Sequence, residues 1–132
     1  MKRSPILLEL SREHHTALVL ALRIARATEP AAQAALLASV PVIFRDELEP
    51  HFQEEERGVL PQLVTVGELA LVNRTLEEHR QMRDLIARMA VGDLNCLKPF
   101  GELLKAHVQF EERELFVTAQ AVLPAAYLDQ HV

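Results

Sequence analysis

The sequence is poor in cysteine, glycine and aromatic residues. It has one cysteine, four glycines and no tryptophan among 132 residues. The single Cys96 cannot form a disulfide within the chain, which suits a reducing compartment and leads us to expect a cytoplasmic protein. So few glycines favour a globular, all-helical chain, and the glycine-rich loop that cradles phosphates is missing.

Long apolar runs and an excess of basic residues are missing too. The formal net charge is −5, and no basic stripe is present to hold phosphates, so nucleic acid is excluded as a partner. No stretch reaches the ~20 uninterrupted apolar residues of a membrane span. The segment Met1-Lys2-Arg3 is followed by Ser-Pro and an amphipathic run, so we expect neither a signal peptide nor a membrane partner.

What the chain does contain favours helices. Apolar residues make up 49 % of the sequence, and alanine, leucine, glutamate and arginine, all good helix formers, dominate. Apolar residues recur with a helical period, whereas the period-two alternation of strands is missing. A chain of 132 residues is large enough for one real core, so we expect a single domain over residues 1–132.

Apolar periodicity and helix-end signals together predict four long amphipathic helices. Ser4 and Pro5 suit the cap and first turn of a helix, and Gly92 suits a helix C-terminus. Such helices, joined by short turns, favour an all-α, antiparallel up-down-up-down four-helix bundle. The expected long helices cover residues 4–27, 40–59, 65–90 and about 93–123, with an alanine-rich piece at 31–38 and a short or frayed helical tail from 125.

Proline and a capping pattern predict where the helices break. Pro41 is expected to interrupt the alanine-rich helix, so that residues 40–59 form either a second helix or a kinked continuation of the first piece, and Pro50 to bend that helix or remove a hydrogen bond. Pro61 is expected to close it. Thr65 and Glu68 have the spacing of a capping box, which predicts Thr65 as the cap of the third helix.

Helical phase also assigns a buried side to each helix. On the first helix the expected buried residues are Leu7, Leu10, Leu18, Ala21 and Ala25. On the third they are Leu69, Val72, Leu76, Met82, Ile86 and Met89.

Two copies of a His-x-x-x-Glu spacing carry the clearest chemical signal. His51 and Glu55 form one copy, and His107 and Glu111 form the other. Residues four apart lie on one face of a helix, one turn from each other. Both pairs fall on the apolar side of their helices, so we expect two imidazoles and two carboxylates in the interior.

Two further histidines, His14 and His79, fall on the apolar sides of the first and third helices. One such histidine alone is more often a satisfied core residue than a ligand. Four on four helices, two with an inward glutamate, are hard to explain as packing. Buried carboxylates are costly unless paired or bound to metal, and a divalent metal pair removes that cost. Imidazole and carboxylate donors without thiolate suit iron or manganese, and zinc uses the same atoms.

Four segments carry a likeness to a known family: Leu10–His15, Glu49–Glu56 followed by Leu60-Pro61, Glu78–Arg83 and His107–Phe116. Together they resemble the hemerythrin-like, or HHE cation-binding, domain family, and the likeness covers essentially the whole chain. The resemblance implies an antiparallel four-helix bundle around a non-haem, oxo- or hydroxo-bridged di-iron centre. Family members bind dioxygen or sense oxygen, iron or nitric oxide.

Carried over by position, the resemblance makes six residues metal ligands: His14, His51, Glu55, His79, His107 and Glu111. It implies that the first two histidines bind one iron, that the other two bind the second, and that both glutamates bridge the pair. Two substitutes stay open, His15 for its neighbour His14 and Glu112 for Glu111, although helical phase favours Glu111. Glu54, Glu56, Glu112 and Glu114 are otherwise expected to be solvated or to lie next to the ligands without binding metal, and Glu112 and Glu114 to pair with Arg113 or other neighbours at the surface.

One departure from the family pattern bears on function. Oxygen-carrying hemerythrins have a second histidine one turn from the third-helix ligand, where this chain has Thr75 or Arg83. With one imidazole fewer, more coordination positions are open, and Arg83 could reach a ligand carboxylate at the site edge. This weakens the case for reversible oxygen carriage and favours sensing, storage or redox chemistry.

The expected function is therefore binding of two non-haem iron ions, with manganese or zinc as alternatives, and of a small ligand such as dioxygen or nitric oxide. A di-iron oxidase or peroxidase, and a structural bundle with a zinc-filled or vestigial site, are the rival interpretations. Bundles of this size occur as monomers or homodimers, and both stay open here.

Overall fold

The chain folds into helices alone. The structure, a computed structural model, describes residues 3–130, and this stretch contains no strand, so the all-α prediction is confirmed. No helix in the same stretch is both long and apolar enough to cross a membrane. In chain order the elements are α1 (Pro5–Arg26), α2 (Pro30–Ile43), the π-helical η1 (Phe44–Leu48), α3 (Glu49–Arg57), α4 (Val59–Thr65), α5 (Leu69–Ala90), the 3₁₀-helical η2 (Leu94–Cys96), α6 (Leu97–Phe110), the π-helical η3 (Glu111–Leu115), α7 (Phe116–Val122) and α8 (Ala125–Leu128).

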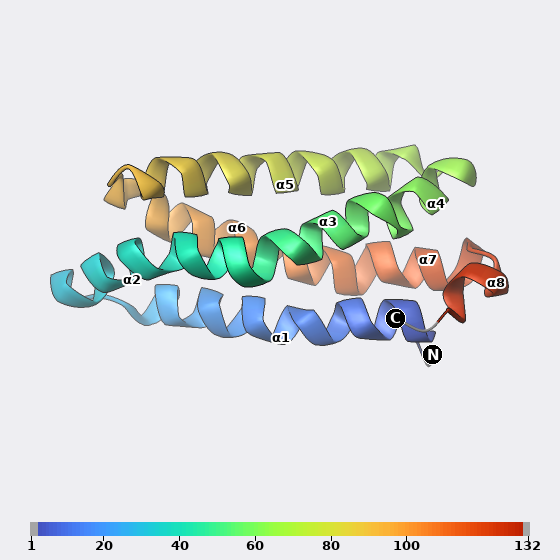
Figure 1. The fold of residues 1–132 in the computed structure, drawn as a ribbon, viewed down its shortest axis with the longest axis horizontal. Helices are drawn as coiled ribbons and strands as arrows, with labels where there is room; N and C mark the ends of the chain where they lie inside the picture. Colours follow the sequence, from blue (N-terminus) through green and yellow to red (C-terminus); the bar gives the residue numbers. More distant parts are fainter. Residues whose placement is uncertain (1–2, 131–132) are drawn as a thin grey trace.

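The helices run along one long axis (Figure 1). α1 and α5 are uninterrupted, whereas α2, η1, α3 and α4 follow one another along one path and α6, η3 and α7 along another. Successive paths run in opposite directions. Segments far apart in the sequence are thereby packed together, α1 on α6 and α3, and α5 on α2 and α6.

The interruption predicted at Pro41 does not occur, and of the two alternatives, a new helix or a continued one, the chain takes the continuation. α2 contains Pro41 and continues to Ile43, and the helix then widens into η1. The disturbance predicted at Pro50 takes the form of this π-helical segment, in which the N–H of Glu49 donates to the Phe44 carbonyl. Pro50 follows in the first turn of α3, where its missing N–H is not needed.

The predicted closing of the helix at Pro61 is also wrong. Pro61 is the third residue of α4, a first-turn position that tolerates proline. The chain breaks instead at Gly58, whose φ of −116° and ψ of −87° separate α3 from α4.

The capping box predicted at Thr65 and Glu68 does not form. Thr65 is the last residue of α4, and its hydroxyl donates to the Pro61 carbonyl. Gly67 has a positive φ of 85°, and the N–H of Glu68 reaches back to the Leu63 carbonyl over 2.9 Å. A helix C-terminus that ends at a glycine therefore forms here in place of the capping box. The same motif ends α5 at Gly92, as predicted, with φ of 98°.

The apolar core has two clusters, one toward each end of the molecule. One contains Ala17 of α1, Phe52 of α3, Met82 of α5 and Leu104 of α6, among others. The second contains residues on the other side of the midpoint of each helical path, including Leu10, Val59, Val72 and Leu115. Between the two clusters each path contributes polar side chains to a buried layer.

Four residues assigned to buried sides are exposed: Leu18, Ala25, Leu69 and Leu76. The buried face of α1 follows His14, Ala17, Ala21 and Ile24, so Leu18 and Ala25 lie one step outside it. Thr75, with an exposed fraction of 0 %, takes the place on α5 that was assigned to Leu76. The apolar strip on each helix is broader than the surface that packs against the core, so the sequence alone cannot tell which of two adjacent apolar residues is buried.

Candidate metal centre

Seven polar or charged residues are buried within residues 3–130, and all come from the layer between the two clusters. α1 contributes one histidine, α3 a histidine and a glutamate, α5 a threonine and a histidine, α6 a histidine and η3 a glutamate. The structure thus brings together all six residues that the sequence singled out. Their exposed fractions are 0 % for Glu55, His79 and Glu111, 1 % for His107, 4 % for His14 and 5 % for His51, with Thr75 at 0 %.

A π-helical segment lies next to each of the two His-x-x-x-Glu pairs. η1 ends at Leu48, just before His51 and Glu55 on α3. η3 begins at Glu111, whose N–H is shared between the carbonyls of His107 and Val108. Such single widened turns are frequent at functional sites, because they shift the phase of the side chains that follow.

Each buried glutamate joins two imidazoles. Glu55 Oε2 lies 3.2 Å from His51 Nε2, and Glu55 Oε1 lies 3.1 Å from His79 Nε2. Glu111 Oε1 lies 2.7 Å from His14 Nε2, and Glu111 Oε2 lies 3.2 Å from His107 Nε2. All four imidazoles therefore present Nε2 to the centre.

These contacts define two groups of four donors, each within 4.8 Å of one another. We call them the α1/α3 half-site (His14, His51, Glu55, Glu111) and the α5/α6 half-site (Glu55, His79, His107, Glu111), after the helices of their histidines. Both glutamates belong to both groups. The grouping matches the partition that the family resemblance implies.

The residues present fit a bound metal pair. Six buried side-chain atoms within residues 3–130 have no hydrogen-bond partner: Nε2 of His51, His79 and His107, both carboxylate oxygens of Glu55 and Oε2 of Glu111. Unpartnered buried polar atoms are costly, so a native fold keeps few of them without a reason. All six belong to the same cluster, and all are atoms that ligate divalent metals.

A glutamate from a neighbouring helix accepts a hydrogen bond from Nδ1 of every site histidine. Glu13 pairs with His51 and Glu56 with His79, each at 2.7 Å. The two remaining pairs are Glu78 with His107 at 2.7 Å and Glu112 with His14 at 2.6 Å. Such a contact fixes the ring and leaves Nε2 as the atom that faces the metal.

These four outer glutamates link the helices in a closed ring. Each lies next in sequence to a site residue of its own helix, and each holds the histidine of another helix. The order runs from α1 to α3, from α3 to α5, from α5 to α6, and from η3, which continues α6, back to α1. Adjacent glutamates next to the predicted ligands were the sequence signal for this ring, but only the packing shows which histidine each one serves.

Arginines hold three of the outer glutamates, and the fourth lacks one. Arg83 binds Glu56 at 2.9 Å, and Arg74 binds Glu78 at 3.2 Å. Arg3 and the Ser11 hydroxyl bind Glu112. Within residues 3–130, Glu13 pairs with no arginine or lysine.

The charges of the cluster shift the pKa values of its members. Burial alone lowers the pKa of His51, but Glu55, Glu111 and Glu13 outweigh it and raise the pKa to about 12. Burial likewise opposes the charge of His107, and Glu111 and Glu78 raise its pKa to about 10. Burial raises the pKa of Glu111, yet contacts with the surrounding histidines bring it well below the ordinary value. The surrounding carboxylates thus favour the charged forms of His51 and His107 in the metal-free chain.

The structure separates the alternatives at neighbouring residues. His15 is exposed, whereas His14 lies in the cluster. Glu112 lies just outside the cluster, half-buried, and binds Arg3 and His14 where Arg113 was one expected partner. Its neighbour Glu114 pairs with Arg74.

The structure also shows where Thr75 and Arg83 lie, the two α5 residues at candidate positions for the additional histidine ligand. Thr75 is buried one turn before His79, and its hydroxyl donates to the Leu71 carbonyl at 2.8 Å. Arg83 binds Glu49 through two hydrogen bonds of 2.7 Å and the outer Glu56, so it reaches no predicted ligand carboxylate. Burial opposes the lowered pKa of Glu56, and hydrogen bonds from Arg83 and His79 overcome it.

Comparison with known proteins identifies one matching family. The family model described as Hemerythrin HHE cation binding domain matches residues 7–119. No curated protein and no solved structure matches the chain. The matched range includes all six predicted ligands and the four outer glutamates.

Proposed function

The chain belongs to the hemerythrin HHE cation-binding domain family, and we propose that it binds two non-haem iron ions and, through them, a small ligand such as dioxygen or nitric oxide. Six orphaned buried donor atoms in one cluster are the observation that carries this proposal. A core without metal would have to keep two carboxylates and four imidazoles where apolar side chains would pack better.

The donor set supports a pair of ions and assigns a role to each residue. His14 and His51 would hold one ion, His79 and His107 the other, and Glu55 and Glu111 would bridge them. Each half-site offers two imidazoles and a share of two carboxylates, a set that suits iron and that manganese and zinc also accept. Four protein donors leave about two of the six positions that iron commonly uses.

The chain's own residues would prepare the site for this ligand. A bound iron pair supplies open coordination positions and a reversible change of oxidation state. The outer glutamates keep the four Nδ1 protons in place and so present unprotonated Nε2 atoms inward once metal is bound. The aromatic rings of Phe52 and Phe116 pack on His79 and His14 and keep water from that side of the imidazoles.

The remaining sequence-based expectations form part of the same proposal. The up-down-up-down four-helix bundle is supported if α2 to α4 count as one interrupted helix and α6 to α7 as another (Figure 1). We keep the single domain over residues 1–132, the cytoplasmic location and a monomer or homodimer as expectations to be tested.

Metal analysis with visible spectroscopy tests the proposal. The chain expressed with iron should contain about two irons, and a visible charge-transfer band should report an iron pair joined through oxygen. Fewer than one iron per chain and no such band would count against it. Zinc in place of iron, with a melting temperature that chelation does not change, would favour the structural bundle; a metal held at thousandfold its Kd should add about 4 kcal/mol to the stability.

A second candidate is an enzyme on the same scaffold. It is favoured by Thr75, which is buried one turn before His79 and offers no imidazole, so that a coordination position would stay open on the α5/α6 half-site. Catalytic turnover of peroxide or nitric oxide that Glu111→Ala abolishes would support this function. Stoichiometric binding without turnover would remove it.

A further inference from the structure

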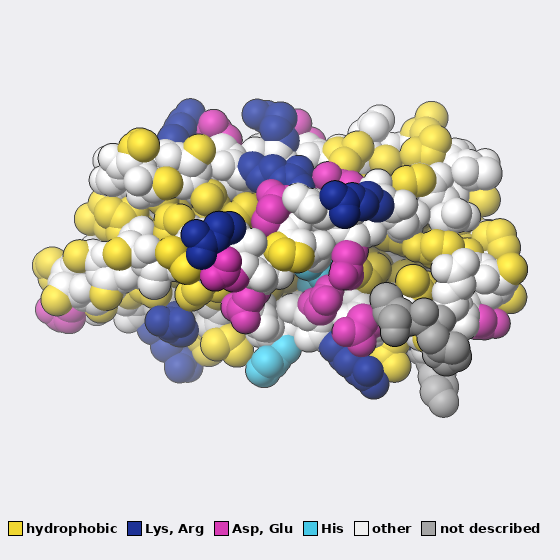
Figure 2. All heavy atoms as spheres, in the orientation of Figure 1, with side chains coloured by type: hydrophobic (Ala, Val, Ile, Leu, Met, Phe, Trp, Pro, Cys, Tyr) yellow, Lys and Arg dark blue, Asp and Glu magenta, His cyan; other side chains and the backbone are white. Residues whose placement is uncertain are grey.

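Three glutamates line the surface outside the α1/α3 half-site. Glu9 and Glu13 come from α1, and Glu54 comes from α3, on the other side of the seam between these helices. Figure 2 shows acidic side chains gathered over this seam, with a histidine visible between them. Glu54 is exposed, and the two residues on α1 are half-buried. We call them the seam glutamates.

At the other seams between helices around the buried polar layer, arginines form ion pairs that bridge the two sides. Arg83 bridges α5 to Glu49 and Glu56 of α3. Arg74 bridges α5 to Glu114 of η3, and Arg3, two residues before α1, binds Glu112 of η3. The α1/α3 seam differs. Within residues 3–130, one seam glutamate forms an ion pair with an arginine or lysine: Glu9 lies 3.7 Å from the exposed Arg12.

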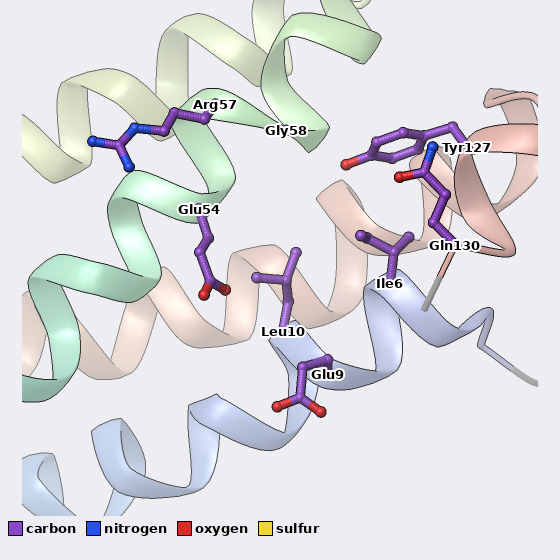
Figure 3. A pocket seen from close by; sticks show the side chains of 8 residues that line it. All are labelled: Ile6, Glu9, Leu10, Glu54, Arg57, Gly58, Tyr127 and Gln130. Atoms are coloured by element: carbon purple, nitrogen blue, oxygen red, sulfur yellow. The ribbon is translucent and has the colours of Figure 1, made fainter. Parts of the chain in front are cut away.

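A pocket of about 390 Å³ opens at this seam. Its acidic side is formed by Glu9 and Glu54, its floor by Leu10, and its far side by Tyr127 and Gln130 (Figure 3). The guanidinium of Arg57 points away from the pocket, toward Gln53, to which it donates. The charge that the pocket presents beside the seam is therefore negative.

The seam also leads inward. Glu13 accepts a hydrogen bond from Nδ1 of His51, and the other ring nitrogen of His51 is one of the orphaned atoms of the metal cluster. Of the four site histidines, His14 and His51 at this seam have the largest exposed fractions, 4 % and 5 %. Glu13 and the imidazole of His51 are thus the two groups between the surface and the donor atoms of the metal cluster.

We propose that the α1/α3 seam is the route by which divalent cations reach the interior, with the seam glutamates as successive carboxylate contacts and the α1/α3 half-site as the first to fill. This inference rests on the proposed metal binding. Carboxylate oxygens bind divalent cations, and a cleft of one sign raises the local concentration of the opposite ion and its association rate. At the other seams the outer carboxylates are already paired with arginines, which leaves fewer of them to contact a cation.

Uptake kinetics test this route without any measurement of activity. Co²⁺ is mixed with the metal-free chain in a stopped-flow instrument, and its visible bands report binding. The double variant Glu9→Gln/Glu54→Gln should take up Co²⁺ about tenfold more slowly at low salt, and added salt should slow the parent but hardly the variant. The final count of bound cations should stay the same.

The matched control is Glu29→Gln/Glu102→Gln, which removes the same number of charges at exposed positions away from the seam. It should load at the parent rate. Glu54→Lys, at an exposed position, reverses one seam charge and should also slow uptake. Parent-like rates in both seam variants would overturn the route and leave metal binding standing, whereas a parent chain that binds no Co²⁺ at equilibrium would overturn the proposed metal site and the route with it.

Discussion

The two half-sites have the same donors but different surroundings. The histidines of the α5/α6 half-site are 0 % and 1 % exposed, and those of the α1/α3 half-site are 4 % and 5 % exposed. His79 stacks on Phe52 with ring centroids 3.9 Å apart, whereas His14 stacks on Phe116 at 5.4 Å. Outside the α5/α6 half-site both outer glutamates are held by arginines, whereas Glu13 of the α1/α3 half-site is 34 % exposed and has none.

This difference separates two properties of a metal site. The inner donors, equal in both halves, decide which metals bind. The outer contacts decide how rigidly the donors are held and how easily water and ions reach them. We therefore expect the metal of the α1/α3 half-site to bind first and to leave first, and each prediction below either removes this contrast or makes it larger.

Loss of a bridging glutamate should have the largest effect, because it damages both halves at once. Glu111→Ala removes a donor from both groups. We expect the variant to hold neither metal firmly and to lose the stabilisation of about 4 kcal/mol that a metal at thousandfold its Kd provides. Metal analysis and thermal unfolding with and without metal check this, with Glu114→Ala, 54 % exposed, as control. Two metals retained in Glu111→Ala would contradict the bridging role.

Single histidine variants should tell the halves apart. His79→Ala should leave one metal, in the α1/α3 half-site, and should also destabilise the metal-free chain by about 3 kcal/mol, because it empties a fully buried site against Phe52. His51→Ala should likewise leave one metal, in the other half-site, and its loss of packing should be smaller, since His51 is 5 % exposed and its ring centroid lies 6.3 Å from that of Phe52. Chemical denaturation of both metal-free variants measures the difference, and equal costs would contradict the contrast.

The pH dependence should have opposite signs with and without metal. The pKa values of about 12 for His51 and about 10 for His107 lie above the ordinary 6.5, so both rings are protonated at neutral pH in the metal-free chain. Their stabilising charge is fully present below pH 6.5 and is lost as the pH rises through 10 and then 12.

Metal must displace these protons, so its affinity should rise with pH by about a hundredfold per unit if two protons leave. Calorimetric titration in buffers of different ionisation enthalpy counts the protons released. Proton release near zero at pH 7 would show that the cluster is neutral before metal binds.

Outer glutamates should have smaller and unequal effects. Glu56→Gln weakens the support of His79 and should lower metal affinity of the α5/α6 half-site by about 10- to 100-fold. Glu13→Gln acts on His51 in the same way, but Glu13 is 34 % exposed and should matter less, with a loss of about tenfold. Competition with a chelator of known affinity measures both. Glu77→Gln, in an exposed pair with Arg80, serves as the control.

Local signals explain what could be predicted from the sequence. The spacing of His51 and Glu55 fixes a common helix face whatever the rest of the chain does, and a histidine within an apolar stripe is placed by the same rule. The six residues accordingly meet in one buried layer, as predicted, while their role as ligands stays a prediction. The stop at Gly92 was also local, since only glycine readily takes the positive φ that this turn needs.

What could not be predicted depends on how helices rotate against one another. Nothing near Glu13 in the sequence shows that it serves His51 of another helix instead of its neighbour His14. The π-helical turns at Phe44–Leu48 and Glu111–Leu115 result from packing and likewise leave no distinct pattern. At Thr65 two valid local signals competed, and the glycine two residues later decided the outcome.

The smallest effect should come from opening the seam between α3 and α5. Arg83 is 33 % exposed and binds Glu49 and Glu56, so Arg83→Met should cost about 1 kcal/mol or less of stability. Glu56 would then resemble Glu13, an outer glutamate without its arginine, and the α5/α6 half-site would become as open as its partner. We expect metal release into a chelator to change from two separated phases toward one. Two phases with unchanged rates would mean that burial and the stacking on Phe52, and not the arginine, hold the second metal.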